Sequence, residues 1–232
     1  MSRLLDGRVA LVTGAATGLG AAIAWRLADA GAIGLAFDIA ERCQDLPQGW
    51  VAHKGDVSEN VDLLDATDKI RQEFGRLDVV VANAGLVPPW RDTENINFDE
   101  WDQVFAVNVK GVAATIRHAV PLMKERGGSI LAMGSLNSHC AHASQCLYTA
   151  SKHAVLGIVR ATALDLGHYG IRVNALGPGP VATDETLEQF ASDTALGRMV
   201  TKEDVARAAL FLVSDQSGGI TGQILPVDAG LP

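Results

Sequence analysis

Short apolar runs alternate with longer amphipathic stretches along the chain. The runs are rich in Val, Ile, Leu and Ala, which is typical of strands buried in a parallel sheet. Seven runs are expected to form strands: Val9–Val12, Ile33–Phe37, Val51–His53, Val79–Ala82, Ser129–Met133, Arg172–Ala175 and Gln223–Val227. Their alternation with helical stretches predicts an α/β fold, with a doubly wound parallel sheet of about seven strands flanked by helices on both faces.

The chain shows no internal division. No repeat, low-complexity segment or polar linker interrupts it, so residues 1–232 are expected to form a single domain. Pro88-Pro89 and Pro178-Gly179-Pro180 are expected to be loops at the carboxyl ends of strands. Ligands bind at this edge of open α/β sheets, so the site is expected near these loops.

Composition narrows the class of protein. The formal net charge is −8 with no basic cluster, which argues against nucleic-acid binding because that affinity comes from neutralising phosphates. The chain is 48% hydrophobic but has no apolar run of about 18 residues, so no membrane span is expected. The start, Met1–Asp6, lacks the features of a signal peptide. We therefore expect a cytoplasmic protein.

A glycine-rich loop follows the first apolar run. The loop Thr13–Gly20 leads into a helical stretch, Ala21–Ala30, which is the order strand, loop, helix that a dinucleotide site requires. Gly14 permits a tight turn, Gly18 lets backbone amides approach a pyrophosphate, and Gly20 allows close helix–strand packing. The spacing is G-x-x-x-G-x-G and differs from the general G-x-G-x-x-G fingerprint.

The second apolar run ends in Asp38, eighteen residues beyond Gly20. An acidic residue at about this distance binds the adenosine ribose hydroxyls and repels a 2′-phosphate. The loop has no Lys or Arg at Ala16 or Thr17, although Arg42 is nearby, so we expect NAD as the cofactor in preference to NADP. The alternative is that Asp38 is an ordinary turn residue that ends a strand.

Tyr148 and Lys152 are four residues apart, and Ser135 lies thirteen residues before Tyr148. On a helix, this spacing places the Tyr and Lys side chains on one face. A phenol has a pKa of about 10, so a Tyr that exchanges protons near neutral pH needs its anion stabilised by about 4 kcal/mol. A lysine ammonium about 4 Å away supplies a Coulomb energy of that size. The alternative is a surface Tyr/Lys pair on an amphipathic helix.

These residues resemble the short-chain dehydrogenase/reductase family, whose motifs recur in order over essentially the whole chain. The matching motifs are Thr13–Gly20, Asp56-Val57, Asn83-Ala84-Gly85, Asn108, Ser135, Tyr148-x-x-x-Lys152, and Pro178-Gly179 followed by Thr183. The resemblance implies a Rossmann-type sheet and a homotetramer or homodimer built on helices around Asn108 to Lys124 and Tyr148 to His168. It also implies a catalytic tetrad of Asn108, Ser135, Tyr148 and Lys152.

The resemblance further implies where the cofactor lies. Asp56 and Val57 would hold the adenine, and Val181 and Thr183 would bind the nicotinamide carboxamide. The full set expected to contact NAD comprises Gly14, Thr17, Gly18, Leu19, Gly20, Asp38, Asp56, Val57, Asn83, Ala84, Gly85, Tyr148, Lys152, Pro178, Gly179, Val181 and Thr183.

The chain also departs from the family pattern. Only eighteen residues separate Asp38 from Asp56, which leaves little room for a helix between the second and third strands. Ala82 replaces an Asn, and Ala229 replaces a Gly of the usual Asp-Gly-Gly. The segment between Thr183 and the helix expected to begin near Thr201 is short for a substrate lid.

The stretch His139–Cys146 holds two His and two Cys, which raises a zinc site as an alternative. Neither a C-x-x-C pair nor an H-x-x-x-H pair is present, so no metal site is expected. The three cysteines are expected to be free thiols. Cys146 as a nucleophile is a further alternative, but no partner base is identifiable.

The sequence therefore predicts an NAD(H)-dependent oxidoreductase that interconverts a secondary alcohol and a ketone. The alternative is an NAD-binding sensor or regulatory protein of the same fold without turnover. Trp101 is expected to pack inside the protein. Substrate-binding positions are expected to include Ser135, Asn137, His142, Gln145 and Trp90, where Asn137 and His142 hint at a diol, polyol or hydroxy acid.

Overall fold

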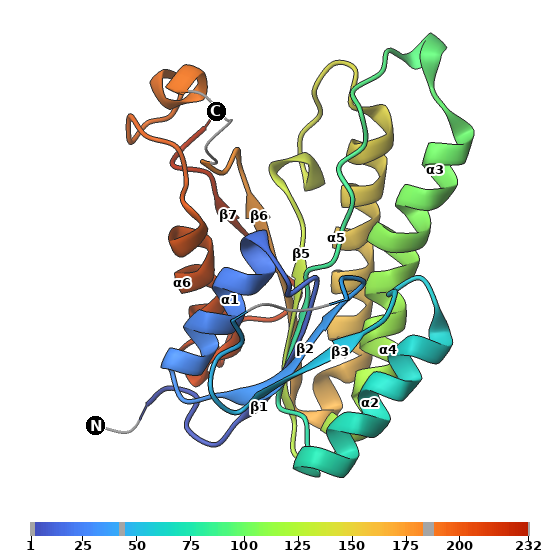
Figure 1. Cartoon of the computed structure of the whole chain (residues 1–232). Helices are drawn as coiled ribbons and strands as arrows, with labels where there is room; N and C mark the ends of the chain where they lie inside the picture. The colour runs from blue at the N-terminus through green and yellow to red at the C-terminus, as the bar shows by residue number, and fades with distance from the viewer. Residues whose placement is uncertain (1–2, 42–44, 183–187, 232) are drawn as a thin grey trace.

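A seven-stranded parallel sheet forms the centre of the computed structural model, which describes residues 3–41, 45–182 and 188–231 (Figure 1). The strand order is β3-β2-β1-β4-β5-β6-β7. The strands are β1 (Val9–Thr13), β2 (Ile33–Asp38), β3 (Trp50–Lys54), β4 (Val79–Ala82), β5 (Gly128–Met133), β6 (Ile171–Pro178) and β7 (Ile224–Val227). All seven predicted strands are confirmed, and β6 continues three residues beyond the predicted end.

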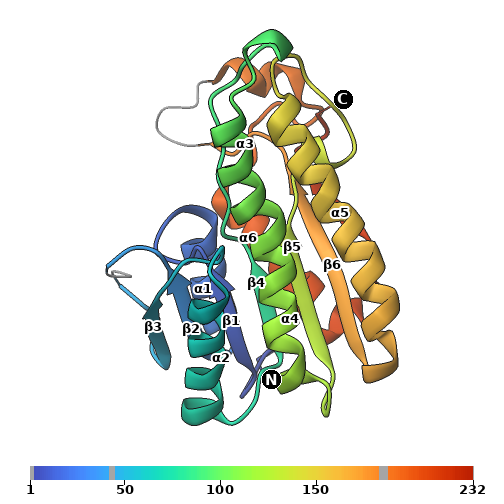
Figure 2. The same ribbon diagram turned by 90° about the vertical axis from the view of Figure 1, so that its right-hand side faces the viewer.

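Helices cover both faces of the sheet, as predicted. Figure 2 shows α2 (Asn60–Phe74), α4 (Val112–Met123) and α5 (Cys146–Leu166) side by side on one face. The helices α1 (Gly18–Asp29) and α6 (Lys202–Val213) pack against the other face. Short 3₁₀ helices comprise Thr93–Asn95, Leu136–Ser138, Gly167–Tyr169, Glu188–Asp193 and Asp215–Ser217.

Successive residues of the central strands supply the two halves of the core. Leu11 and Ile130 face α2, α4 and α5, whereas their neighbours Val12 and Leu131 face α1 and α6. Side chains alternate across a strand, so a strand covered on both faces must be apolar at every position. This is why the apolar runs predicted the strands.

The connection between β2 and β3 contains no helix in its described residues, 39–41 and 45–49, as the short spacing predicted. One face of β3 is therefore less covered than the central strands: Ala52 and Lys54 are exposed. The edge of the sheet next to Asp38 is therefore exposed on the face of β3 that carries these two residues.

A long helical segment crosses the face opposite α1. It begins as α3 (Phe98–Phe105), passes through a π-helix (Ala106–Gly111) and continues as α4. Asn97 caps its start by accepting hydrogen bonds from the amides of Asp99 and Glu100. The π-helix holds Asn108, one of the residues expected in the site.

Three further details concern the remaining elements. Thr201 caps α6, which begins at Lys202, close to the predicted start. Ala229 has a φ of 58°, in the left-handed region that favours the Gly found there in the resembling family. Among the described residues, no helix has both the length and the apolar composition that a membrane span requires.

Candidate active site

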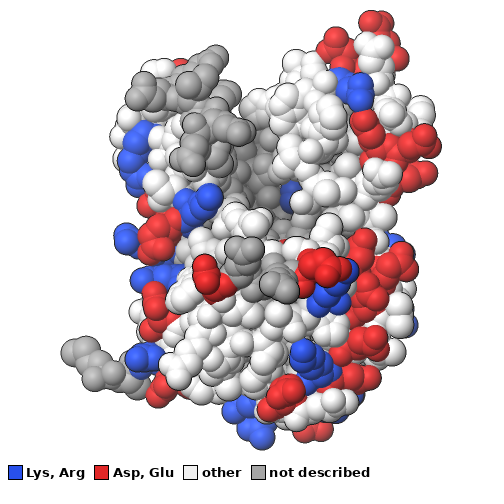
Figure 3. Space-filling model, viewed as in Figure 1, with Lys and Arg blue, Asp and Glu red and all other residues white. Residues whose placement is uncertain are grey.

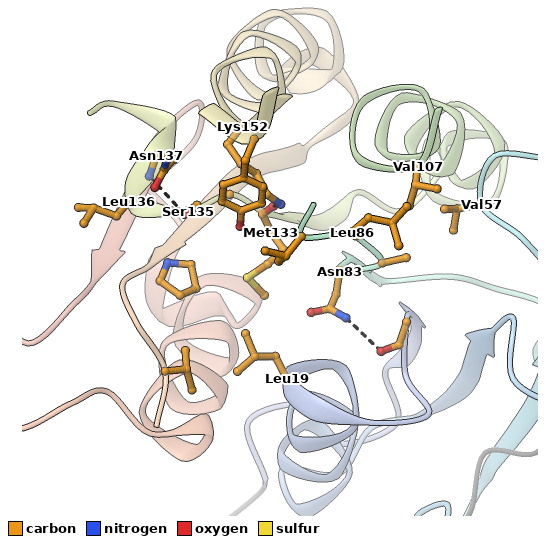
Figure 4. Close-up of a pocket in the computed structure, with 18 of the residues that line it drawn as sticks. Leu19, Val57, Asn83, Leu86, Val107, Met133, Ser135, Leu136, Asn137 and Lys152 are labelled. Atoms are coloured by element: carbon orange, nitrogen blue, oxygen red, sulfur yellow. Dashed lines mark hydrogen bonds between the residues drawn. The ribbon is translucent and has the colours of Figure 1, made fainter. Parts of the chain in front are cut away.

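A cavity of about 860 Å³ lies at the carboxyl ends of the strands, and Figure 3 shows a hollow in the surface above the sheet. It is lined from both sides, by the glycine loop after β1 and by residues of β5, α5 and the loop after β6 (Figure 4). Most predicted site residues line it. The lining set includes Gly14, Thr17, Leu19, Asp38, Asp56, Val57, Asn83, Ala84, Gly85, Trp90, Ser135, Asn137, His142, Gln145, Tyr148, Lys152, Pro178, Gly179 and Val181.

Three predicted residues are not part of this lining, and one cannot be placed. Gly18, Gly20 and Asn108 belong to the elements around the cavity but do not line it. Thr183 lies outside the described residues.

The glycines of the loop meet different demands. Gly14 has a φ of +65° and Gly18 a φ of +60°, both in the left-handed region. A Cβ on Gly20 would lie 1.9 Å from the main-chain oxygen of Gly14, so helix α1 could not approach the loop with any larger residue. A Cβ on Gly18 would meet nothing within 4 Å, which leaves open space at the N-terminus of α1. This arrangement suits an anionic group at the helix N-terminus.

Thr13 and Asn83 join the loop to the neighbouring strand β4. Thr13 Oγ1 accepts hydrogen bonds from the amides of Asn83 and Ala84, at 3.0 and 3.1 Å. Asn83 Nδ2 donates to the main-chain oxygens of Thr13 and Gly14, at 3.0 and 3.1 Å (Figure 4). The side chain of Asn83, just after β4, therefore holds the glycine loop in place.

Asp38 lies at the end of β2 and faces the same loop. Its Oδ2 accepts a hydrogen bond from the Ala16 amide at 2.8 Å, and its Oδ1 accepts one from the Ala40 amide at 3.0 Å. The carboxylate lines the cavity, where it would be close to the ribose end of a bound dinucleotide.

The opposite wall at this end is formed by Asp56 and Val57. Asp56 Oδ1 accepts a hydrogen bond from the Ser58 amide, and the Asp56 amide donates to Asp62 Oδ2, both at 2.8 Å. Val57 is buried against Gly111, where a Cβ would lie 2.8 Å from Val57 Cγ2. These contacts hold the loop after β3 against the π-helix.

Tyr148 and Ser135 meet at the other end of the cavity. Ser135 follows β5 and caps the 3₁₀ helix Leu136–Ser138, with its Oγ accepting from the Asn137 amide at 3.2 Å. Tyr148 is in the first turn of α5. Burial raises the pKa of Tyr148 above that of a free phenol, and a hydrogen bond with Ser135 opposes this rise.

Lys152 lies one turn after Tyr148 on α5, and its side chain is buried. Nζ donates a hydrogen bond of 2.8 Å to the main-chain oxygen of Met133 and is 5.6 Å from the centre of the Tyr148 ring. Burial lowers the pKa of Lys152 to about 8.

The direction of the pKa shift of Tyr148 differs from the one expected from the sequence. Lys152 was expected to lower the pKa of Tyr148, but the structure raises that pKa because burial of the phenol outweighs the other influences. The lysine approaches the ring while its ammonium group bonds to Met133. The cavity as described therefore favours a protonated Tyr148.

Asn108 connects two parts of the site without lining the cavity. Its Oδ1 accepts from the Leu86 amide at 2.7 Å, and its Nδ2 donates to the Leu86 oxygen at 2.9 Å. Nδ2 also donates to Ser151 Oγ at 3.3 Å, and Ser151 Oγ donates to the main-chain oxygen of Tyr148 at 2.8 Å. Asn108 thus ties the loop after β4 to the helix that carries Tyr148 and Lys152.

The expected substrate end contains contacts that the sequence did not reveal. Asn137 Nδ2 donates to Gln145 Oε1 at 2.8 Å and to Thr149 Oγ1 at 2.9 Å, so both amide protons have partners within the protein. Trp90 packs edge-on to Tyr148, with ring centres 5.8 Å apart. No local sequence signal marks Thr149 as a partner of Asn137, because the contact joins two separate elements.

Two loops form the outer wall of this end. The Arg91 amide donates to the Ser144 oxygen at 2.8 Å, and Ser144 Oγ donates to Asp92 Oδ1 at 2.5 Å. The Arg91 guanidinium forms a double hydrogen bond with Glu100. These contacts hold the loop that carries Trp90 against the loop that carries Gln145.

The remaining candidates take other roles. His142 lines the cavity, and its Nε2 lies 3.6 Å from Cys140 Sγ. Over the described residues, no three His, Cys, Asp or Glu side chains form a group able to hold a metal ion. Trp101 stacks on Phe105, with ring centres 5.1 Å apart, in keeping with the expected packing role.

The chain is similar to known proteins over nearly its whole length. A family model described as enoyl-(acyl carrier protein) reductase matches residues 14–232. Short-chain dehydrogenase reductase 3a of Arabidopsis thaliana is 37% identical, over 97% of this chain and 95% of the relative.

Two solved structures share the fold. The 3-ketoacyl-(acyl-carrier-protein) reductase of Brucella melitensis, complexed with NADH, is 33% identical with a TM-score of 0.92, over 97% of this chain and 98% of that one. Carveol dehydrogenase of Mycobacterium avium, in complex with NAD, is 33% identical with a TM-score of 0.91, over 99% of each chain. The chain belongs to the short-chain dehydrogenase/reductase family and is an NAD(P)-dependent oxidoreductase acting on alcohol and ketone groups.

Proposed function

We propose that this chain uses NAD(H) to interconvert a secondary alcohol and a ketone, with Tyr148 as the general acid/base. The observation that carries the proposal is one cavity lined by the glycine loop and Asp38 at one end and by Tyr148 and Ser135 at the other. A dinucleotide site and a proton-transfer group thus share one space. Residues 1–232 would act as one catalytic domain.

The residues of this chain fit the cofactor. The open space at Gly18, beside the start of α1, can take the pyrophosphate, and Asp38 can bind the ribose hydroxyls. For the rest of the binding set we propose the residues expected from the sequence, with Asp56 and Val57 at the adenine. Pro178, Gly179 and Val181 line the same cavity as Lys152.

Bound NAD would supply the acceptor for the hydride that leaves the alcohol carbon, and NADH would return it to the carbonyl carbon in the reverse direction. Tyr148 would take the hydroxyl proton in oxidation and donate it to the carbonyl oxygen in reduction. Ser135 would hold the same oxygen by a hydrogen bond. The protonated state that burial favours at Tyr148 is the state that reduction requires.

Lys152 and Asn108 would support this proton transfer. Lys152, when charged, would stabilise the tyrosinate across the 5.6 Å to its ring and would bond the nicotinamide ribose. Asn108 would hold the loop after β4 and the first turn of α5 in register through Leu86 and Ser151. A water seated by Asn108 would relay protons between Lys152 and solvent.

NAD is proposed as the preferred cofactor. Asp38 would face the 2′-phosphate of NADP, and its two oxygens already accept hydrogen bonds from backbone amides that hold it in place. The two similar structures named above contain NADH and NAD, which supports the same choice.

The proposed substrate is a small alcohol or ketone, with diols, polyols and hydroxy acids as the classes to test first. Trp90, Asn137, His142 and Gln145 would line its binding site beside Ser135. The experiment is a screen by NADH fluorescence of the purified protein against alcohols, sugars, polyols and cyclic ketones. Turnover with any of them supports the proposal; NAD binding without turnover across the panel would indicate a non-catalytic sensor of the same fold.

A further inference from the structure

The substrate end of the cavity has a mainly apolar wall. Leu86, Val87 and Trp90 come from the loop after β4, and Leu136 and Pro180 face them from two other loops. Trp90 is 51% exposed although it contacts Tyr148, so much of the indole remains available to a ligand. Such a wall suits an apolar body next to the reacting carbon.

The side-chain amide of Gln145 lies in this region, where its oxygen is bonded within the protein and its nitrogen is available as a donor. Gln145 Oε1 accepts a hydrogen bond from Asn137 Nδ2, and the buried Asn137 is itself anchored to Thr149. Within the part of the chain that the structure describes, Gln145 Nε2 donates to no protein group. Gln145 lines the cavity, so this amide can donate to a ligand.

Gln145 is also close to the proposed reaction centre. It is the N-cap of α5, and its main-chain oxygen accepts from the Thr149 amide, so it begins the turn that carries Tyr148. Side chains three residues apart at a helical turn have Cβ atoms about 5–6 Å apart. Because Gln145 and Tyr148 also line the same cavity, an oxygen bound by Gln145 would lie close to the reacting carbon of the substrate.

The cavity offers little to an anionic substrate. Among its described lining residues, Lys152 is the one Lys or Arg side chain, and its Nζ bonds to Met133. Arg91, beside the cavity, is engaged by Glu100 at 2.6 Å.

We propose that Gln145 is a specificity-determining residue and that the substrate is uncharged, with a second oxygen that accepts a hydrogen bond from Gln145 Nε2. The chemical class is a neutral hydroxyketone, diketone or keto ester, or the corresponding alcohol. Among the classes named above, this excludes hydroxy acids in their carboxylate form. The inference rests on the proposed function, since Tyr148 and Ser135 define where the reacting oxygen lies.

The preference for a neutral substrate with a second oxygen should be large, for two physical reasons. A site that hydrogen-bonds a substrate oxygen disfavours an analogue without it, because the protein donor is then left unpaired. A carboxylate that enters an apolar cavity without a cation loses its hydration without compensation. Both effects should appear in kcat/KM, since both act on binding near the transition state.

The experiment compares three ketones of similar shape as oxidants of NADH with the full-length protein. Methyl acetoacetate is neutral and has the second oxygen, hexan-2-one is neutral and lacks it, and acetoacetate has it but is anionic. We expect kcat/KM for methyl acetoacetate to exceed that for each of the others by at least about tenfold.

Two variants test the residue itself. Gln145→Met removes the donor at similar volume and should bring methyl acetoacetate and hexan-2-one to within about threefold of each other. Gln145→Glu replaces the donor by an acceptor and should lower the ester's kcat/KM further below that of the wild type. Gln72→Met, at an exposed position on α2, is the matched control and should preserve the wild-type ratio. NADH binding by fluorescence shows whether each variant is folded.

The outcomes separate this inference from the proposed function. If kcat/KM for hexan-2-one or acetoacetate equals that for methyl acetoacetate, the inference alone is overturned. If kcat/KM for acetoacetate is the highest, the inference is overturned as well, and His142 becomes the candidate cation. An unchanged ratio in Gln145→Met would also overturn it. Failure of every ketone and alcohol in a protein that binds NADH would overturn both.

Discussion

Lys152 and Tyr148 lie one turn apart on α5, yet the ammonium of Lys152 bonds to the Met133 oxygen and lies 5.6 Å from the centre of the Tyr148 ring. Lys152 is buried and Tyr148 is partly buried, and this shifts their pKa values in opposite directions: that of Tyr148 rises and that of Lys152 falls to about 8. Burial thus disfavours the charged form of each. Lys152 still keeps its proton at neutral pH, because its pKa falls only to about 8.

Replacing Tyr148 by Phe should remove nearly all turnover and leave NADH binding largely intact. Only the hydroxyl is lost, and the ring still packs against Trp90. General acid/base groups contribute about 10²–10⁴ in rate, so kcat should fall at least about a hundredfold. Steady-state kinetics and NADH fluorescence measure the two effects. A variant that oxidises alcohol at the wild-type rate would remove Tyr148 from the proposed chemistry.

Lys152→Met should change how stability depends on pH. The unfolded lysine keeps its proton up to about 10.4, whereas the folded one loses it near pH 8, so the unfolded state binds more protons between these values. Stability of the wild type relative to the variant should therefore rise with pH from about 8 to 10, by up to about 1.4 kcal/mol per pH unit, and stay constant below about 7.

Urea unfolding of both proteins at pH 6, 7, 8, 9 and 10 would measure this difference. The subtraction removes the contributions of groups that both proteins share. A difference that is flat across the range would mean that Lys152 keeps its proton when folded. The variant should also bind NADH more weakly, because the proposed ribose contact is lost.

Asp38 should decide between the two cofactors. NAD should bind at least about tenfold more tightly than NADP, which corresponds to about 1.4 kcal/mol, because the carboxylate would face the 2′-phosphate. Asp38→Ala should reduce that ratio to about threefold or less. Asp29→Ala, an exposed carboxylate at the end of α1, is the control and should keep the wild-type ratio. Fluorescence titration with NADH and NADPH measures each ratio; equal affinities in the wild type would contradict the assignment.

The proposed assembly is a homodimer or homotetramer built on α4 and α5. The outer side of α5 has Leu164, which is 85% exposed, and Gly157, where a Cβ would meet nothing within 4 Å. Small residues such as Ala150, Ala154 and Ala161 on this helix would allow a second helix to approach closely. Closed symmetry pairs such a surface with its own copy.

Sedimentation at micromolar concentration should therefore give the mass of a dimer or tetramer. Gly157→Glu should shift the protein towards smaller species, because it places paired like charges in a close contact. Val61→Glu, at an exposed position on α2, should leave the mass unchanged. A wild-type monomer at this concentration would rule the assembly out.

The central strands could be predicted because each is apolar on both faces, and local sequence suffices to show this, as in Val79–Ala82. The glycine loop could be predicted for a similar reason, since Gly14 and Gly20 meet backbone constraints that few other residues satisfy. The absence of a helix from the described residues between β2 and β3 followed from chain length alone.

Other features depend on distant contacts and could not be predicted. The pairing of Asn137 with Gln145 and Thr149 arises only when the loop after β5 folds over the start of α5. The pKa of Tyr148 depends on how much protein surrounds the phenol, which spacing in the sequence does not reveal. The π-helix around Asn108 has no signature in apolar periodicity.

Because of that π-helix, the number of residues between α3 and α4 determines which way the side chains of α3 point relative to those of α4. Relative to an unbroken α-helix, the wider turn of Ala106–Gly111 accommodates about one additional residue between α3 and α4. Each residue of an α-helix advances the direction of the side chains by about 100°. Deleting a single residue here would leave the composition almost unchanged and yet turn the buried Val104 away from its packing partners. Insertions and deletions in this segment should therefore be tolerated far less than substitutions.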